Sequence, residues 1–366
     1  MKNLFNYYFK KRFTVVLIIT IICLVISTIA LNEMRFIRNS TYWVEGLPGY
    51  KGQEYIEVKV PGESPIGMIS FFAAVLATII PLFEFYFKMR KINVDQMYSL
   101  PIKRSKLFFV KYIVGLAEVL IPVTITFLYC VIWVGCSKHL FQMIYFLPFY
   151  FSLMLVSTIV YTIISFIYTR ANTFFDGIIL ILMYLIILPI FMVTIDEIFR
   201  TDFWSYSFFY SPYFSITRIF EALLKHKNLV GTPHYELDFN EYMIYSIIIN
   251  FITACCASFL FFYLNPKDKA ENEFERSNSL FAYKVIIPIV AAVSSMAFSY
   301  STDYIITPII MVLAYLSLVV YHRSFKVPWK ELVLMFGIII AFAFMSLVVD
   351  NIDLFPDEPT FDYYYY

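Results

Sequence analysis

The sequence has 366 residues, of which 60% are hydrophobic and only 15% are charged, with a formal net charge of +1. A soluble domain is about half apolar, so this chain carries more apolar surface than a water-soluble core needs. Runs of about 20 apolar residues recur along it, and a run of that length crosses a bilayer as a helix. The sequence therefore predicts an all-α polytopic membrane protein. Its near-neutral charge gives no reason to expect a nucleic-acid partner.

The first segment, residues 1–12, is short and amphipathic. Its apolar side chains share one helical face: Leu4, Phe5, Tyr8 and Phe9. A segment of this kind lies in the plane of the membrane interface, which predicts an elbow helix ahead of the first span. The basic residues of the segment are equally compatible with a plain cytoplasmic anchor.

Nine apolar runs follow in chain order. The predicted spans are residues 13–31, 65–87, 108–135, 143–168, 174–195, 242–264, 284–301, 304–321 and 332–349. Pro288 and a pair of serines interrupt the seventh run, so the count is eight if that run does not cross. Between the first two spans, the outer loop 32–64 holds an alternating stretch at residues 55–60, which predicts one strand of a hairpin.

Basic residues set the expected orientation. With the N-terminus inside, the inner segments carry 18 Lys and Arg residues and the outer segments carry 9. Because Lys and Arg are retained on the cytoplasmic side, we expect a multi-pass protein of a bacterial plasma membrane with a cytoplasmic N-terminus. Nine spans place the acidic, tyrosine-rich C-terminus outside, and eight would place it inside.

The loop between the second and third spans, residues 88–107, is the most basic part of the chain. It holds six bases: Lys88, Arg90, Lys91, Lys103, Arg104 and Lys106. Asn93 or Asp95 is predicted to cap a short helix that runs through Tyr98, and Pro101 to end it, because the residue before proline avoids helical dihedrals. Ser105 is predicted to cap the next long helix. The expected product is a short cytoplasmic helix joined to two spans, able to pass force from a partner into the membrane.

A second amphipathic segment lies between the fifth and sixth spans, in the region 196–241. Apolar residues recur there at helical spacing: Ile216, Ile219, Phe220, Leu223 and Leu224. Pro212 suits the first turn of a helix, with Ser211 as its cap. This helix is too polar to span, so we expect it at the outer membrane face.

Three ionisable residues lie within or at the ends of apolar runs: Glu84, Lys111 and Glu118. Charge inside a membrane is costly and usually faces protein or water. Glu84 and Lys111 fall at similar depth on neighbouring spans, which predicts an ion pair between helices. Glu118 lies about 10 Å deeper than Lys111 at 1.5 Å per residue. It has no evident partner in the sequence, so it is the better candidate for a polar contact on a translocation path.

Catalytic signatures are absent from the sequence. It has no G-x-x-x-x-G-K-[ST] phosphate loop, no H-E-x-x-H and no G-x-S-x-G. The chain is therefore not expected to be an enzyme or to hydrolyse ATP by the phosphate-loop route. No cofactor or metal site is expected in it.

Two motifs resemble those of one transporter family. The inner loop reads SLPIKRSKLFFVKYIVGL at residues 99–116, and the outer segment reads SFFYSPYFSITRIFEALL at residues 207–224. Both resemble segments of the transmembrane permease subunits of bacterial type 2 ABC exporters. The resemblance covers residues 1–264 and implies a six-helix permease core with an N-terminal elbow helix. Residues 265–366, a charged loop and about three further spans, would be an extension.

The resemblance implies partners and site residues. It implies a separate cytoplasmic ABC ATPase that holds ATP and magnesium, and a second permease subunit, either a homodimer partner or a sibling, in contact with membrane lipids. The expected ATPase-coupling residues are Asp95, Gln96, Met97, Tyr98, Pro101, Lys103 and Arg104. The second and fifth spans would line the path, with Glu118, Glu84 and Lys111 as candidate path residues. The outer interfacial helix would use Pro212, Phe214 and Phe220.

The expected function is ATP-driven export, with an amphipathic or antimicrobial peptide or a lipid-like molecule as substrate. Two other functions remain open. An ion-coupled secondary transporter would use Glu118 as its coupling acid, and would be expected to show inverted repeats. A non-transporting sensor or scaffold subunit would use the outer segments 32–64 and 196–241 as a receiving surface.

The orientation predicts a labelling pattern in intact cells. In a background without accessible native cysteines, Glu273→Cys should resist an impermeant thiol reagent, because residue 273 lies in an inner loop. Thr232→Cys should react, because residue 232 lies in an outer segment. Labelling of the first position and protection of the second would reverse the assignment.

Overall fold

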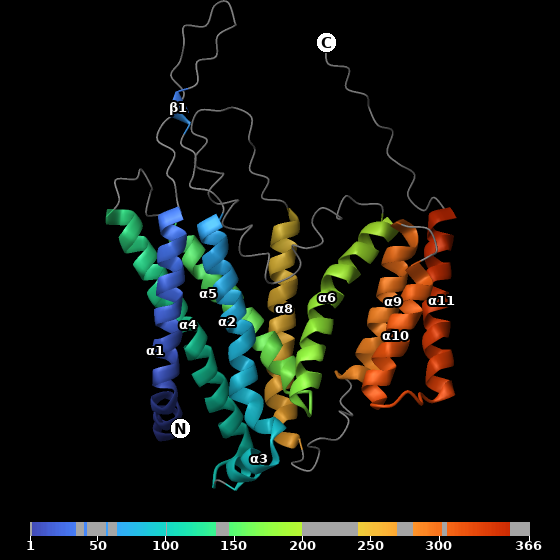
Figure 1. The fold of residues 1–366 in the computed structure, drawn as a ribbon, viewed down its shortest axis with the longest axis horizontal. Helices are drawn as coiled ribbons and strands as arrows, with labels where there is room; N and C mark the ends of the chain where they lie inside the picture. Colours follow the sequence, from blue (N-terminus) through green and yellow to red (C-terminus); the bar gives the residue numbers. More distant parts are fainter. Residues whose placement is uncertain are drawn as a thin grey trace, which may run out of the picture. The chain divides into compact units, whose positions relative to one another are not determined.

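Apolar runs fold as long helices throughout the part of the chain that the structure describes. The structure is a computed structural model, and it describes residues 2–33, 40–41, 56–57, 64–99, 101–136, 146–199, 241–268, 281–301 and 306–351. The first helices are α1 (Lys2–Glu33), α2 (Ser64–Phe85), α3 (Lys91–Tyr98), α4 (Arg104–Cys136) and α5 (Phe146–Tyr168). The later ones are α6 (Phe174–Phe199), α8 (Glu241–Leu264), α9 (Tyr283–Ser301), α10 (Ile306–His322) and α11 (Trp329–Asn351). Two short 3-10 turns, η1 (Tyr86–Met89) and η4 (Asn265–Lys267), follow α2 and α8 (Figure 1).

Within the described residues, eight of the nine predicted spans coincide with a helix to within a few residues, and the first, 13–31, lies inside the longer helix α1. Five segments are long and apolar enough to cross a membrane: Asn3–Ile29, Ile69–Met89, Arg104–Trp133, Tyr150–Tyr168 and Ile248–Lys267. Shorter apolar stretches lie in the others: Phe174–Leu185 in α6, Val285–Met296 in α9 and Thr307–His322 in α10. The protein is therefore an all-α, multi-pass membrane protein. Helix α9 runs unbroken through Pro288, and whether it crosses the bilayer stays a prediction.

The separate N-terminal elbow helix predicted for residues 1–12 is wrong. Helix α1 is a single helix of 32 residues from Lys2 to Glu33, and no glycine or proline interrupts it. Its amphipathic face packs on α4 instead of lying in the interface. The contact joins Tyr8, Leu4 and Phe5 to Leu107, Val110 and Val114. A partner helix thus takes up the apolar face that the sequence assigned to headgroups.

The predicted strand in residues 55–60 is present for two residues. Strand β1 (Ser40–Thr41) pairs antiparallel with β2 (Ile56–Glu57), with Ser40 opposite Glu57. The rest of the loop 32–64 lies outside the described residues.

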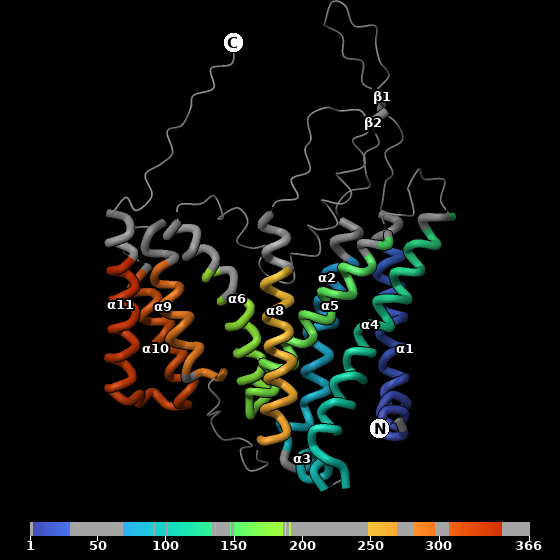
Figure 2. Tube along the Cα trace, turned by 180° about the vertical axis from the view of Figure 1, so that it is seen from behind, coloured from blue at the N-terminus to red at the C-terminus, as the bar shows by residue number. Residues whose placement is uncertain are grey.

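The chain divides into two compact units. The first is formed by Met1–Phe87, Gln96–Phe166 and Pro212–Lys267. In it α1 runs beside α4, and α2 packs against both (Figure 2). Helix α8 packs against α2 and α4 through aromatic rings. The centre of the Phe261 ring lies 5.2 Å from that of Phe85 and 6.2 Å from that of Phe108, edge to face in both cases. Such edge-to-face pairs are favoured by the ring quadrupole.

The second unit is formed by Lys88–Asp95, Ile167–Ser211 and Asp268–Tyr366. Helix α9 is its centre and packs against α6, α10 and α11. Asp176, in the first turn of α6, accepts from the Tyr283 hydroxyl at 3.2 Å and from the Arg323 guanidinium at 3.2 Å. These contacts tie α6 to the ends of α9 and α10. The predicted permease core, residues 1–264, is thus distributed over both units.

Candidate functional site

Helix α3 forms in the basic loop, earlier in the chain than expected. The N–H of Asn93 donates to the carbonyl of Arg90 at 3.0 Å, so Arg90 precedes the first turn. Because η1 ends at Met89 and α3 begins at Lys91, only Arg90 is left to act as the junction. Asn93 and Asp95 therefore lie inside the helix, and the prediction that one of them caps it is wrong.

The far end of α3 and the start of α4 frame a tight turn. Helix α3 stops at Tyr98, as predicted, with Pro101 three residues later. The carbonyl of Lys103 accepts the N–H of Lys106 at 2.9 Å. Since α4 therefore begins at Arg104, Ser105 lies within the first turn, and the prediction that Ser105 caps α4 is wrong.

Helix α3 has a bonded face and an exposed face. On the bonded face, the Tyr8 hydroxyl donates to the Met97 sulfur at 3.1 Å, and the Arg104 guanidinium lies 4.2 Å from the centre of the Tyr98 ring. The exposed face carries Ile92, which is 73% exposed, with Asp95 and Gln96. Of the expected coupling residues, Asp95, Gln96, Pro101, Lys103 and Arg104 are thus exposed. Met97 and Tyr98 are half-buried against α1 and α4.

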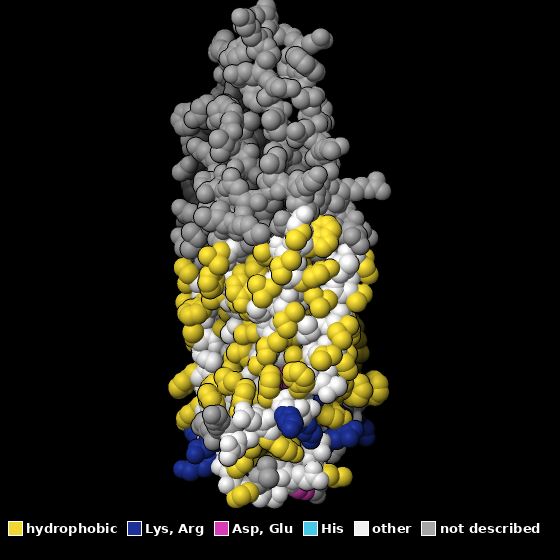
Figure 3. All heavy atoms as spheres, turned by 90° about the vertical axis from the view of Figure 1, so that its left-hand side faces the viewer, with side chains coloured by type: hydrophobic (Ala, Val, Ile, Leu, Met, Phe, Trp, Pro, Cys, Tyr) yellow, Lys and Arg dark blue, Asp and Glu magenta, His cyan; other side chains and the backbone are white. Residues whose placement is uncertain are grey.

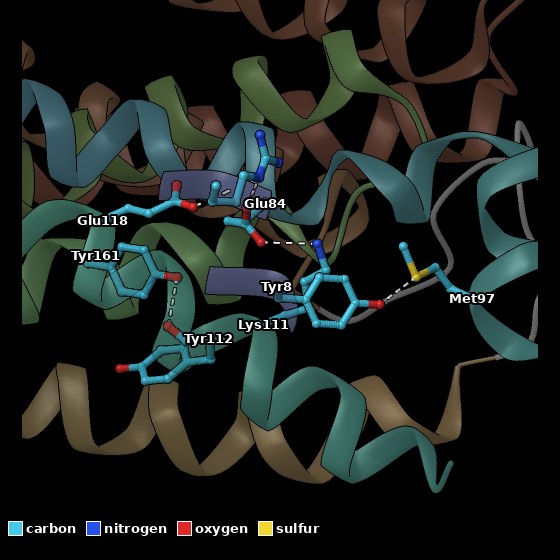
Figure 4. A network of polar contacts seen from close by, with 8 residues as sticks. Tyr8, Glu84, Met97, Lys111, Tyr112, Glu118 and Tyr161 are labelled. Atoms are coloured by element: carbon cyan, nitrogen blue, oxygen red, sulfur yellow. Dashed lines mark hydrogen bonds and ion pairs between the residues drawn. The ribbon is translucent and has the colours of Figure 1, made fainter. Parts of the chain in front are cut away.

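The three ionisable residues of the apolar helices come together in a buried ion cluster with Arg12 (Figure 4). Glu84 is 1% exposed, Lys111 5% and Glu118 2%. The Lys111 ammonium donates to Glu84 Oε2 at 3.1 Å, so the predicted ion pair is present. Arg12 Nε lies 2.8 Å from Glu84 Oε1 and 3.8 Å from Glu118 Oε1. The cluster therefore joins α1, α2 and α4.

Arg12 is the member that sequence reasoning missed. The sequence alone offers Glu118 no partner, because an elbow helix over residues 1–12 would hold Arg12 at the membrane surface. One signal was available: Arg12 is the last base before the first apolar run. A base at the edge of such a run reaches intramembrane acids when its helix continues straight into the membrane. The negative charges of Glu84 and Glu118 are then balanced by the positive charges of Arg12 and Lys111. Buried charges are tolerated when they are paired in this way.

Tyr8 connects the ion cluster to α3. The Lys111 ammonium lies 4.7 Å from the centre of the Tyr8 ring, within the range of a cation–π contact. The hydroxyl of the same ring donates to Met97. One side chain on α1 thus touches both the ion cluster and α3.

Gly115 allows three helices to approach at the ion cluster. The Tyr161 hydroxyl, from α5, donates to the Tyr112 carbonyl of α4 at 3.0 Å. A Cβ added at Gly115 would lie 2.3 Å from the Tyr161 hydroxyl oxygen and 3.0 Å from Glu84 Cγ. A side chain at position 115 would therefore push α2 and α5 away from α4.

A second ionic contact lies in the other compact unit. Lys88 Nζ is 2.5 Å from Asp268 Oδ2, and Arg170 Nη2 is 3.0 Å from the same oxygen. Lys88 also donates to the Thr169 carbonyl. These bonds hold Asp268, the first residue after η4, beside Lys88 of η1 and Arg170, which follows α5.

Gly115→Ala is expected to lower stability by about 1–3 kcal/mol, the usual cost of overpacking. Alanine is the better helix former by about 1 kcal/mol, so a loss must come from the contact with Tyr161 and Glu84. The measurement is the thermal unfolding midpoint of the purified protein in detergent. Gly337→Ala is the matched control, because a Cβ there meets no atom within 4 Å. Equal midpoints for the two variants would contradict the close packing at Gly115.

The outer helix residues Pro212, Phe214 and Phe220 lie outside the described residues. The structure thus brings together Glu84, Lys111 and Glu118, and it places α3 beside them. Comparison with protein-family models, with curated proteins and with solved structures finds no match to this chain.

Proposed function

We propose that the chain is the transmembrane permease subunit of a bacterial type 2 ABC exporter, working with a separate cytoplasmic ATPase. The observation that carries the proposal is α3, a short helix fixed on one face and exposed on the other. Its bonded face is held by Tyr8 and Arg104, and its exposed face presents Ile92, Asp95 and Gln96. An exposed apolar side chain flanked by polar ones suits a protein partner.

The contacts give a route for force from α3 into the membrane. Displacement of α3 acts on α1 through Met97 and Tyr8, and on α4 through Tyr98 and Arg104. Tyr8 and Arg12 are four residues apart on α1, so they share a helical face. A movement of α1 therefore changes the distance from Arg12 to Glu84 and Glu118. Because the ion cluster has members on α1, α2 and α4, a movement of α1 would change the contacts of all three helices at this point.

Glu118 is the candidate path residue in this scheme. It is buried in this conformation, and Arg12 is its counter-ion at 3.8 Å. Movement of α1 away from α4 would free the carboxylate for water or substrate. ATP and magnesium would be held by the partner ATPase, and a second permease subunit would complete the exporter. The substrate would be an amphipathic peptide or a lipid-like molecule.

The buried carboxylate also favours a second candidate, an ion-coupled secondary transporter. In that case Glu118 would exchange a proton or cation as Arg12 moves between the two acids. The two functions differ in energy source. An exporter subunit binds an ATPase and stimulates or is driven by ATP hydrolysis, whereas a secondary transporter works in ATP-free vesicles under an ion gradient.

A triple variant of the exposed face of α3 tests the ATPase contact. Ile92→Ser, Asp95→Ser and Gln96→Ser together should leave folding intact, because these side chains face outward, and should lower co-purification of the ATPase or uncouple its stimulation. The matched control is Phe325→Ser with Lys326→Ser, two exposed residues of the turn before α11. Retention of ATPase binding and activity by the triple variant would remove the coupling role of α3.

Glu118→Gln tests the ion cluster against Glu84→Gln. Glu84 contacts both bases, so Glu84→Gln should cost about 3–5 kcal/mol, the typical loss when a buried pair is broken. Glu118→Gln leaves Arg12 and Lys111 on Glu84, so the folded protein should be recovered in normal yield while substrate-stimulated ATPase activity falls. The measurements are the thermal midpoint and ATPase stimulation in reconstituted vesicles. Full transport by Glu118→Gln would exclude Glu118 from the mechanism.

A further inference from the structure

The bases near the N-terminal ends of α1 and α4 include inward-facing and outward-facing side chains. Arg12 and Lys111 face inward and contact the buried acids Glu84 and Glu118. Four lysines face outward: Lys10, Lys11, Lys103 and Lys106. Among the described residues, these four ammonium groups make no ion pair, whereas both inner bases do.

The local sequence supplies no acid to neutralise the outer lysines. Residues 2–32 and 101–117 contain no Asp or Glu. The nearest acids in the ion cluster, Glu84 and Glu118, are buried and already contact the inner bases. Within the residues that the structure describes, these four positive charges are not paired with an acid and are open to a counter-ion from outside the chain.

The lysines of the two helices lie near the level at which α1 and α4 pack together. Tyr8 of α1 packs against Leu107 and Val110 of α4. At 1.5 Å per residue, Lys11 lies about 5 Å beyond Tyr8 along α1, and Lys106 lies within about 2 Å of Leu107. The headgroup layer of a bilayer leaflet is about 5–8 Å deep, and lysine side chains extend toward it. Figure 3 shows Lys and Arg side chains gathered in a band at one end of the apolar surface on this face.

The surface deeper in the membrane suits acyl chains. Leu17 and Ile18 lie seven residues after Lys10 and Lys11, two turns on along the same faces of α1, and they are 46% and 51% exposed. Phe109 of α4, one turn after Lys106, is 42% exposed. Cationic side chains followed by exposed apolar ones match the two parts of a phospholipid.

We propose that this face of α1 and α4 binds an anionic phospholipid. The phosphate and other headgroup oxygens accept from Lys10, Lys11, Lys103 and Lys106, and the acyl chains lie along Leu17, Ile18 and Phe109. The bound lipid supplies the negative charge that the local sequence lacks. It also fixes the depth of α1, the helix that carries Arg12 and Tyr8. The lipid site does not depend on the identity of the transported substrate or on the ATPase.

Native mass spectrometry of the full-length protein tests the site. The protein is titrated with phosphatidylglycerol or with phosphatidylcholine of the same acyl chains. Lys10→Gln with Lys11→Gln, and separately Lys103→Gln with Lys106→Gln, should each weaken phosphatidylglycerol binding roughly 10- to 30-fold, since one basic residue near an anionic surface is worth about 1 kcal/mol. Phosphatidylcholine binding should not change. Lys10→Arg with Lys11→Arg should retain phosphatidylglycerol, because the charge is kept.

Lys326→Gln with Lys330→Gln is the matched control, since both are exposed lysines in the other compact unit. Normal phosphatidylglycerol binding by this control, with loss in the α1 and α4 variants, supports the site. An equal loss in the control would show a general charge effect and would overturn the proposal. Unchanged binding in the α1 and α4 variants would overturn it as well. Displacement of phosphatidylglycerol by inorganic phosphate, but not by chloride at equal ionic strength, would indicate a free-anion site and would also overturn it.

Discussion

The contact between Arg12 and Glu84 constrains the rest of the first compact unit. A carboxylate that is 1% exposed among apolar helices must be neutralised by a nearby base. Lys111 and Arg12 both reach Glu84, from α4 and α1. Arg12 reaches Glu84 from a helix that is continuous from Lys2 to Glu33, so the first turns of α1 run straight on into its apolar part. The ion cluster thus explains why the amphipathic N-terminal segment packs on α4 and is not an interfacial elbow.

The sequence predicted those parts of the molecule that depend on composition and depth. Apolar runs located the helices, and equal depth on consecutive spans paired Glu84 with Lys111. Helix starts were less predictable, since Asn93 and Ser105 favour capping positions but lie within first turns. The start of α3 is set by the end of η1 at Met89, and the start of α4 by the turn that contains Pro101. The contact of Arg12 with Glu118 was not predictable from spacing either, because it joins segments about a hundred residues apart.

The bases near the N-terminal ends of α1 and α4 differ in their surroundings: some contact buried carboxylates and others are exposed at the surface. Lys111 is 5% exposed and the Arg12 side chain is 29% exposed, and protein carboxylates are the counter-ions of both. Lys10 and Lys106 are exposed, and within the part of the chain that the structure describes they form no ion pair. Neighbouring residues of one helix, Lys11 and Arg12, therefore have opposite requirements. The two residues are only about 1.5 Å apart along α1 but point about 100° apart around it, so the face of the helix, and not the depth, separates the two requirements.

Tyr8 links the ion cluster to α3. Its ring lies over Lys111, its hydroxyl bonds Met97 of α3, and Arg12 lies one turn further along the same helix face. The helix has no proline or glycine at which to bend. In the proposed exporter a displacement of α3 acts on α1 through this contact, and the contacts of Arg12 with Glu84 and Glu118 are the ones that a movement of α1 changes.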